Sequence, residues 1–273
     1  MGRLPTPIDD LTAAVGIEEA IDPEPLLARF LARVGSDAAA VLQAGLQKVR
    51  GLADLRQRAI YVAKEGSDRR LLFVKSHELA HQTLPWHKVN LAYRDDDLSL
   101  SAEVQEEFDQ EANFFAAEVI FQGARFTKRV RDYRPSFAAI FQLADEHGAS
   151  RHATAWRYIE EQDETVGLIQ YWPSRYALDE AGRPALRRGK VIGSRRFVEK
   201  YESLEIPFNL PMRHPWLAAR DTSDPVHGDE ITLTRNGSSV RFHWEAWWNT
   251  HTLFVLLRRR PKLSLVRRVL RST

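Results

Sequence analysis

The five residues His77-Glu78-Leu79-Ala80-His81 decide how this chain folds around them and what chemistry it can carry. The apolar spacing around them predicts a helix from Leu71 to Thr83, which ends shortly before a proline. His77 and His81 lie one helical turn apart, so both imidazole rings project from the same face and can bind one metal ion together. Glu78 lies about 100° further round the helix, beside such an ion, where its carboxylate can accept a proton from water.

The metal expected at this helix is zinc, with ligands other than cysteine. The chain has 273 residues and no cysteine, so disulfides and thiolate ligands are excluded. A catalytic zinc ion keeps three protein ligands and one open position, where it activates water and polarises a scissile carbonyl. A third ligand from His, Asp or Glu is therefore required. The lack of cysteine also fits a cytoplasmic protein, which is the location we expect.

His87 is one candidate for this third ligand. It follows His81 at the metzincin spacing, but Leu84-Pro85 stands where that pattern has its turn glycine. The pattern also requires a Met-turn, and the only methionines are Met1 and Met212. His87 is therefore not the ligand that the sequence favours.

A second predicted helix, from Glu103 to Gln122, supplies the other two candidates, Asp109 and Glu111. Its apolar stripe consists of residues at helical spacing: Phe108, Ala112, Phe115, Ala116 and Val119. The two acidic residues flank this stripe on opposite sides. Periodicity alone therefore leaves both as alternatives.

The two helices together resemble a known family, the ImmA/IrrE metallo-endopeptidases. The resemblance rests on His77-Glu78-Leu79-Ala80-His81 followed by Glu111-Ala112-Asn113-Phe114-Phe115-Ala116-Ala117-Glu118, and it covers about residues 55–160. It implies a gluzincin-like α+β domain of a few helices and a short antiparallel sheet. It also implies a zinc ion bound by the two histidines and by a carboxylate of the second helix.

In that family the third ligand is usually a Glu that precedes the Asn of an Ala-Asn pair by four residues. The equivalent position here is Asp109, whose side chain is one methylene shorter, and Glu111 is the alternative. Asn113 follows Asp109 by one helical turn, so it lies on the same face and can hydrogen-bond to the metal ligands.

The remaining sequence predicts two further regions. Residues 136–147 and 151–162 form a helix-turn-helix-like pair, and Glu230–His243 forms a hairpin around the type I′ turn Asn236-Gly237. We therefore expect a zinc peptidase domain over 1–130, a helical segment over 131–170 and a β-containing basic module over 171–273.

Two predictions concern the region before the zinc helix. Residues 10–55 show the pattern of two or three helices. A strand follows around Ile60 and Val62, and it is either an open sheet edge that holds an extended peptide or an ordinary strand with a protected edge.

Charge and hydropathy limit the partners of the chain. Its net charge is +2, but residues 181–273 hold 18 Lys and Arg against 8 Asp and Glu, a balance of +10 that leaves −8 for the first 180 residues. This basic half can face an acidic partner or nucleic acid, or it can be a solvated surface. The longest apolar run near the C-terminus is Leu253–Leu257, and no signal peptide is visible, so we expect no membrane partner.

Two functional hypotheses follow. The first is a zinc-dependent endopeptidase with Glu78 as general base, which cleaves a specific regulatory protein such as a helix-turn-helix repressor, as the resemblance implies. The second is a non-catalytic zinc-containing regulator that binds DNA or protein through its C-terminal half. The presence of a general base favours the first, because a purely structural zinc site does not need one.

Overall fold

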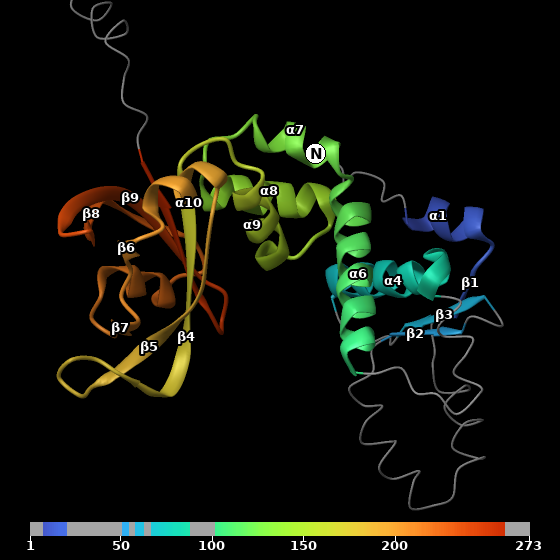
Figure 1. Cartoon of the computed structure of the whole chain (residues 1–273), viewed down its shortest axis with the longest axis horizontal. Helices are drawn as coiled ribbons and strands as arrows, with labels where there is room; N and C mark the ends of the chain where they lie inside the picture. Colours follow the sequence, from blue (N-terminus) through green and yellow to red (C-terminus); the bar gives the residue numbers. More distant parts are fainter. Residues whose placement is uncertain (1–7, 21–50, 55–57, 63–66, 88–101, 260–273) are drawn as a thin grey trace, which may run out of the picture. The chain divides into compact units, whose positions relative to one another are not determined.

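The computed structural model describes residues 8–20, 51–54, 58–62, 67–87 and 102–259 (Figure 1). The chain divides into two compact units, one comprising residues 1–126 with 144–150 and the other residues 127–143 with 151–273. Helices and antiparallel strands occur in both, so the predicted α+β class is confirmed.

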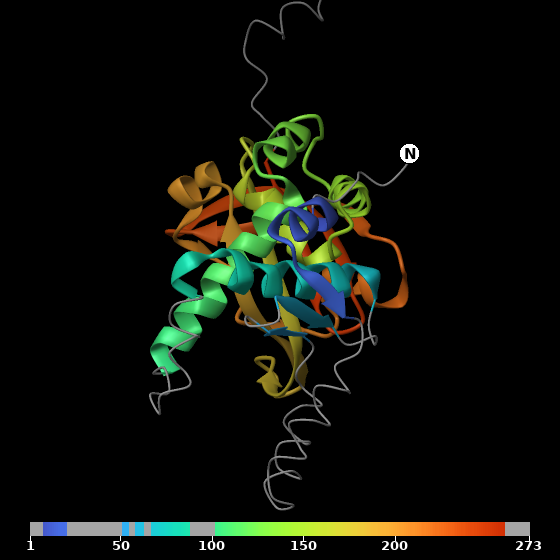
Figure 2. The same ribbon diagram turned by 90° about the vertical axis from the view of Figure 1, so that its right-hand side faces the viewer.

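The first unit is built around two crossing helices, α4 (Asp68–Thr83) and α6 (Ala102–Phe121). Helix α4 also packs against a three-stranded sheet, and Figure 2 shows α4 lying along this sheet and α6 crossing α4. The sheet has the order β1-β3-β2, with α1 beside it. The bounds of these elements are α1 Ile8–Val15, β1 Glu18–Ala20, β2 Gly51–Asp54 and β3 Ala59–Val62.

The prediction of two or three helices over residues 10–55 needs correction. Gly51–Asp54 is a strand and not part of a helix, because it pairs antiparallel with β3 and tertiary pairing outweighs local propensity. Residues 21–50, which this prediction also covers, lie outside the described residues. Strand β3 is central, with β1 parallel on one side and β2 antiparallel on the other, so it offers no open edge to a peptide.

The second unit contains a seven-stranded sheet with the order β6-β8-β9-β10-β4-β5-β7, and every neighbouring pair is antiparallel. The strands are β4 Val166–Leu178, β5 Pro184–Gly193, β6 Leu204–Glu205, β7 Asn209–Pro211, β8 Val226–Arg235, β9 Ser238–Trp248 and β10 Leu253–Arg258. The helices along the rest of the chain are α7 Ala124–Val130, α8 Phe137–His147, α9 Arg151–Glu160, α10 Arg195–Tyr201 and the 3-10 helix η2 Pro215–Asp221.

Aromatic side chains form much of the core of the second unit. The ring of Phe242 on β9 lies 5.1 Å from that of Tyr201, which α10 supplies, and Trp216 of η2 is fully buried. Trp244 and Trp247 are buried too. Burial of such large rings supplies much of the favourable free energy of folding.

The predicted hairpin is confirmed. Strands β8 and β9 meet at Arg235 and Ser238, which are paired in register, and the two residues between them are Asn236 and Gly237. Their φ angles are 49° and 73°, as a type I′ turn requires. None of the helices within the described part of the chain is long and apolar enough to span a bilayer.

Candidate metal centre

The packing of α4 on α6 brings the candidate ligands together. On α4, Leu72, Leu79 and Ala80 are buried, and these positions repeat at helical spacing on one face. On α6, the buried residues are Phe108, Ala112, Ala116 and Ile120. Ala80, Ala112 and Ala116 are completely buried, and such small side chains let two helices approach closely. A close approach is what a short side chain such as that of Asp109 needs.

Three side chains converge at this crossing: His77, His81 and Asp109. The Nε2 atoms of His77 and His81 lie 3.2 Å apart, and Oδ1 of Asp109 lies 3.8 Å from the first and 3.9 Å from the second. Among the described residues, this is the one group of three or more His, Asp or Glu side chains with ligand atoms within 4.8 Å of one another.

These distances fit a tetrahedral zinc ion. Nitrogen and oxygen ligands about 2.0–2.1 Å from zinc lie roughly 3.3 Å from each other in a tetrahedral site. The pair of ring nitrogens already has this separation. The side chain of Asp109 is 66% exposed, so it can move the remaining few tenths of an ångström without disturbing the core. The residues present therefore suit the metal that the sequence predicts.

The surroundings of His77 favour the neutral imidazole that a metal requires. Its Nδ1 lies 3.1 Å from Oδ1 of Asn113, and an amide oxygen only accepts, so Nδ1 carries the proton and Nε2 keeps its lone pair. Burial lowers the pKa of His77, although the contacts with Asn113 and Asp109 raise it. Asn113 thus lies where the sequence places it, one turn from Asp109 and beside a candidate ligand.

Glu111 lies outside the group of three. Its Oε2 accepts a hydrogen bond of 2.6 Å from Nε1 of Trp86 and lies 2.8 Å from Nε2 of His87. The hydrogen bonds from Trp86 and His87 hold the pKa of the Glu111 carboxyl below its usual value. Of the two acidic residues that the periodicity left open, Asp109 is the one that faces both histidines.

Glu78 and His87 complete the description of the predicted residues. Glu78 follows His77 on α4 and is half-buried. His87 is fully buried, and its Nδ1 lies 2.9 Å from Nδ1 of His81. The contacts of His87 with Glu111 and His81 could not be predicted, because a spacing of six residues does not show where a side chain points after a helix has ended.

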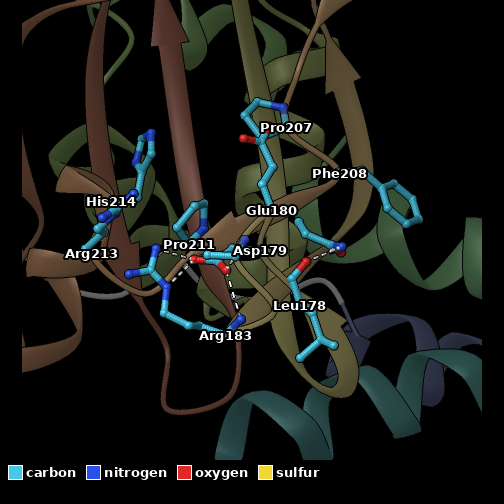
Figure 3. A pocket seen from close by; sticks show the side chains of 11 residues that line it. Leu178, Asp179, Glu180, Arg183, Pro207, Phe208, Pro211, Arg213 and His214 are labelled. Carbon is cyan, nitrogen blue, oxygen red and sulfur yellow. Dashed lines mark hydrogen bonds and ion pairs between the residues drawn. The ribbon is translucent and has the colours of Figure 1, made fainter.

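A cavity of about 730 Å³ in the second unit offers different chemistry (Figure 3). The Asp179 carboxylate in its wall accepts hydrogen bonds from Arg183, and Nδ2 of Asn209 donates to the carbonyl oxygen of Leu178 at 2.8 Å. Asp179 and Arg183 in this wall are paired with each other. The cavity therefore shows no group comparable to that of His77, His81 and Asp109.

The basic side chains of α9 are engaged within the second unit. The guanidinium of Arg151 lies 3.9 Å from the centre of the Phe141 ring, and Arg157 forms an ion pair of 3.1 Å with Glu161. The Nε2 atom of His152 lies 2.8 Å from Nε2 of Gln170. A DNA-reading helix exposes such side chains to the bases, so these contacts favour a packing role for α9.

The family comparison covers the part of the chain that contains this group of side chains. Residues 40–158 match the family of the IrrE N-terminal-like domain, peptidase family M78. This match confirms the resemblance of residues 40–158 to the ImmA/IrrE family. This family comprises metallopeptidase-type proteins and IrrE-like regulators, and it is zinc-dependent in general.

One solved structure is similar over most of the chain. It is described as a Mycobacterium tuberculosis transcriptional regulator, and the alignment has 13% sequence identity and a TM-score of 0.48. It covers 92% of this chain and 70% of the other. No curated protein matches the chain.

Proposed function

We propose that this protein is a zinc-dependent endopeptidase, with His77, His81 and Asp109 as metal ligands and Glu78 as general base. The observation that carries the proposal is the convergence of three ligand atoms, with the two Nε2 atoms 3.2 Å apart. In this proposal residues 1–130 form the peptidase domain, residues 131–170 a helical segment and residues 171–273 a β-containing module.

The zinc ion, when bound, would polarise the scissile carbonyl and acidify the attacking water. Glu78 accepts the proton of that water as its oxygen bonds to the carbonyl carbon. Glu78 then gives this proton to the amide nitrogen as the carbon–nitrogen bond breaks, so an amine leaves and a carboxylic acid remains. The position of Glu78, next to His77 on α4, supports this role.

Exposed aromatic side chains beside the ligands support a protein substrate. The ring centre of Phe73, whose side chain is 38% exposed, lies 6.3 Å from that of His77. Trp86 is 48% exposed and adjoins His87. Such rings can bind an apolar side chain of a substrate next to the cleaved bond. By family resemblance we propose a regulatory protein, such as a helix-turn-helix repressor, as that substrate.

The decisive variant is Glu78→Gln, which keeps the size of the side chain but cannot accept the proton. We expect it to bind one zinc ion per chain, as the wild type does, and to cleave about 10²–10⁴-fold more slowly. The measurement is metal content by mass spectrometry, together with labelling of new N-termini in lysates incubated with each zinc-loaded protein. New N-termini that appear equally with the Glu78→Gln variant, or with neither protein, would contradict the proposal.

Phe73→Ala tests the substrate surface separately. We expect an increased KM for the identified substrate with unchanged zinc content, because Phe73 is not itself one of the proposed metal ligands. An unchanged KM would remove Phe73 from the proposed substrate site.

The alternative function, DNA binding through the C-terminal half, has less support. Arg151, His152 and Arg157 are occupied by contacts within the second unit. Salt-sensitive DNA binding that survives Glu78→Gln would nevertheless establish it.

A further inference from the structure

A chain of close contacts links Glu111 through His87 to His81. Oε2 of Glu111 lies 2.8 Å from Nε2 of His87, and Nδ1 of His87 lies 2.9 Å from Nδ1 of His81. His87 is fully buried, and its ring stacks on Phe108 with ring centres 4.2 Å apart and an interplanar angle of 18°. The orientation of the His87 ring is therefore set by packing as well as by its two polar contacts.

The donor and acceptor rules give this chain of contacts a direction. A carboxylate oxygen can only accept, so Nε2 of His87 carries a proton and donates it to Glu111. A neutral imidazole has one N–H, so Nδ1 of His87 is then an acceptor. The facing Nδ1 of His81 must be the donor, which leaves Nε2 of His81 without a proton.

The same donor and acceptor rules determine the tautomer of His77, whose partner is Asn113. Asn113 accepts from Nδ1 of His77, so Nε2 of His77 also keeps its lone pair. The two Nε2 atoms, 3.2 Å apart, therefore point lone pairs at each other with no proton between them. The two lone pairs repel each other until a cation lies between the nitrogens. Two ring nitrogens with free lone pairs are what a metal ion needs in order to bind.

We propose that His87, oriented by Glu111, is a positioning residue that fixes the tautomer of His81 and so presents Nε2 of His81 to the metal. The inference rests on the proposed metal site, and it gives Glu111 a role other than that of a ligand. Neither His87 nor Glu111 binds the ion. Because of these two residues, the proton of His81 is already on Nδ1 and its ring is already oriented before the metal binds.

The first test uses the metal-free wild-type protein at pH 8 and does not depend on activity. Long-range ¹H–¹⁵N spectra of the histidines distinguish the two neutral tautomers of each ring. We expect the proton of His81 on Nδ1 and that of His87 on Nε2. A His81 ring with its proton on Nε2 overturns the proposal, because the chain of donors then runs in the opposite direction.

The second test measures zinc affinity by competition with a chelator. Glu111→Ala removes the acceptor at a position whose side chain is 38% exposed, so the fold should survive. We expect a zinc affinity about 10–100-fold lower, which is typical when a partner of a ligating histidine is lost. Glu107→Ala removes an equal charge from an exposed site one turn earlier on α6, and we expect it to change the affinity little.

Variants of His87 distinguish a role in positioning the His81 ring from a general loss of folded structure. His87→Leu removes both polar ends, and we expect a loss of similar size to that of Glu111→Ala. In His87→Gln the side-chain amide supplies an oxygen that can accept from His81 and an N–H that can donate to Glu111, so we expect most of the affinity to be retained. Zinc affinity of His87→Gln as low as that of His87→Leu counts against the proposal.

The double variant Glu111→Ala with His87→Leu decides between positioning and direct ligation. If Glu111 acts through His87, the double variant binds zinc as tightly as His87→Leu alone. If Glu111 is itself a ligand, the second substitution lowers the affinity further, and the proposal fails. A wild-type protein that binds no zinc refutes the proposed function, whereas the tautomers of the metal-free protein still test the positioning role.

Discussion

Oδ1 of Asn113 lies 3.1 Å from Nδ1 of His77, and this contact connects α6 to the face of α4 that carries the two histidines. Asn113 and Asp109 are one helical turn apart, so one face of α6 supplies both a carboxylate and an amide oxygen to the same group. The relative position of the two helices therefore controls both the distances within this group of side chains and the tautomer of His77.

Replacement of Asn113 tests this connection. We expect Asn113→Ala to lower zinc affinity about 10-fold or more, because His77 loses the acceptor that keeps its proton on Nδ1. Asn113→Asp retains an oxygen acceptor and serves as the matched control, with a smaller loss. Chelator competition measures both, and equal affinities for wild type and Asn113→Ala would rule out this role.

Substitutions at Asp109 distinguish it from Glu111 as the third ligand. Asp109→Ala should lower zinc affinity by more than the roughly 10–100-fold expected for loss of a partner of a ligand, because it removes a ligand itself. Asp109→Glu should retain one zinc ion per chain, since it restores the residue usual in the family at this position. Metal analysis alongside Glu111→Ala provides the comparison. A variant Asp109→Ala that binds zinc as tightly as wild type would eliminate Asp109 as a ligand.

Gly167 is required by close packing in the second unit. It pairs with Gly193 across β4 and β5, and a Cβ at residue 167 would lie 2.5 Å from the ring of Phe197. We expect Gly167→Ala to lower the free energy of unfolding by about 1–3 kcal/mol, because the ring or the strands must move. Urea denaturation measures this loss. In a Phe197→Leu background the same substitution should cost less, and an equal cost in both backgrounds would show that the ring is not the cause.

His214 predicts a pH dependence of stability in the second unit. Burial lowers its pKa below the ordinary value of 6.5, and its Nδ1 accepts a hydrogen bond from the backbone N–H of Trp216. The His214 imidazole therefore takes up a proton from solvent more readily in the unfolded chain than in the folded protein. The contribution of His214 to stability is complete above about pH 6.5 and is lost as the pH falls below that value.

The matched variant for this prediction is His214→Asn, which can still cap η2 but does not titrate in this range. Thermal unfolding followed by tryptophan fluorescence should show a larger drop in Tm for wild type than for the variant between pH 7.5 and pH 5.5. Identical drops would mean that His214 is not the group responsible.

The helices of the candidate site are predictable because their signals are local. The i, i+4 spacing of His77 and His81 and the apolar stripe through Phe108 and Ala112 determine α4 and α6 at the positions observed. The turn at Asn236-Gly237 is equally local, because it depends on the φ angles that these two residues tolerate.

The strands around β3 show the limit of such signals. Gly51–Asp54 has no strong strand pattern of its own and becomes a strand by pairing with residues 59–62. The central place of β3 depends on β1, which lies about 40 residues earlier in the chain. Pairing partners that are distant in sequence leave no periodic pattern to detect.

The sequence by itself determined that two imidazoles share one helix face, that Glu78 lies beside them, and that cysteine plays no part in the chemistry. Asp109 and Glu111 flank the same buried stripe on opposite sides, and only the tertiary structure showed which of them faces the two histidines. The crossing of α4 and α6 turns Asp109 toward both histidines and leaves Glu111 against Trp86 and His87. The physical reason is that helical periodicity fixes directions within one helix, whereas the distance between side chains of two helices depends on how their surfaces pack.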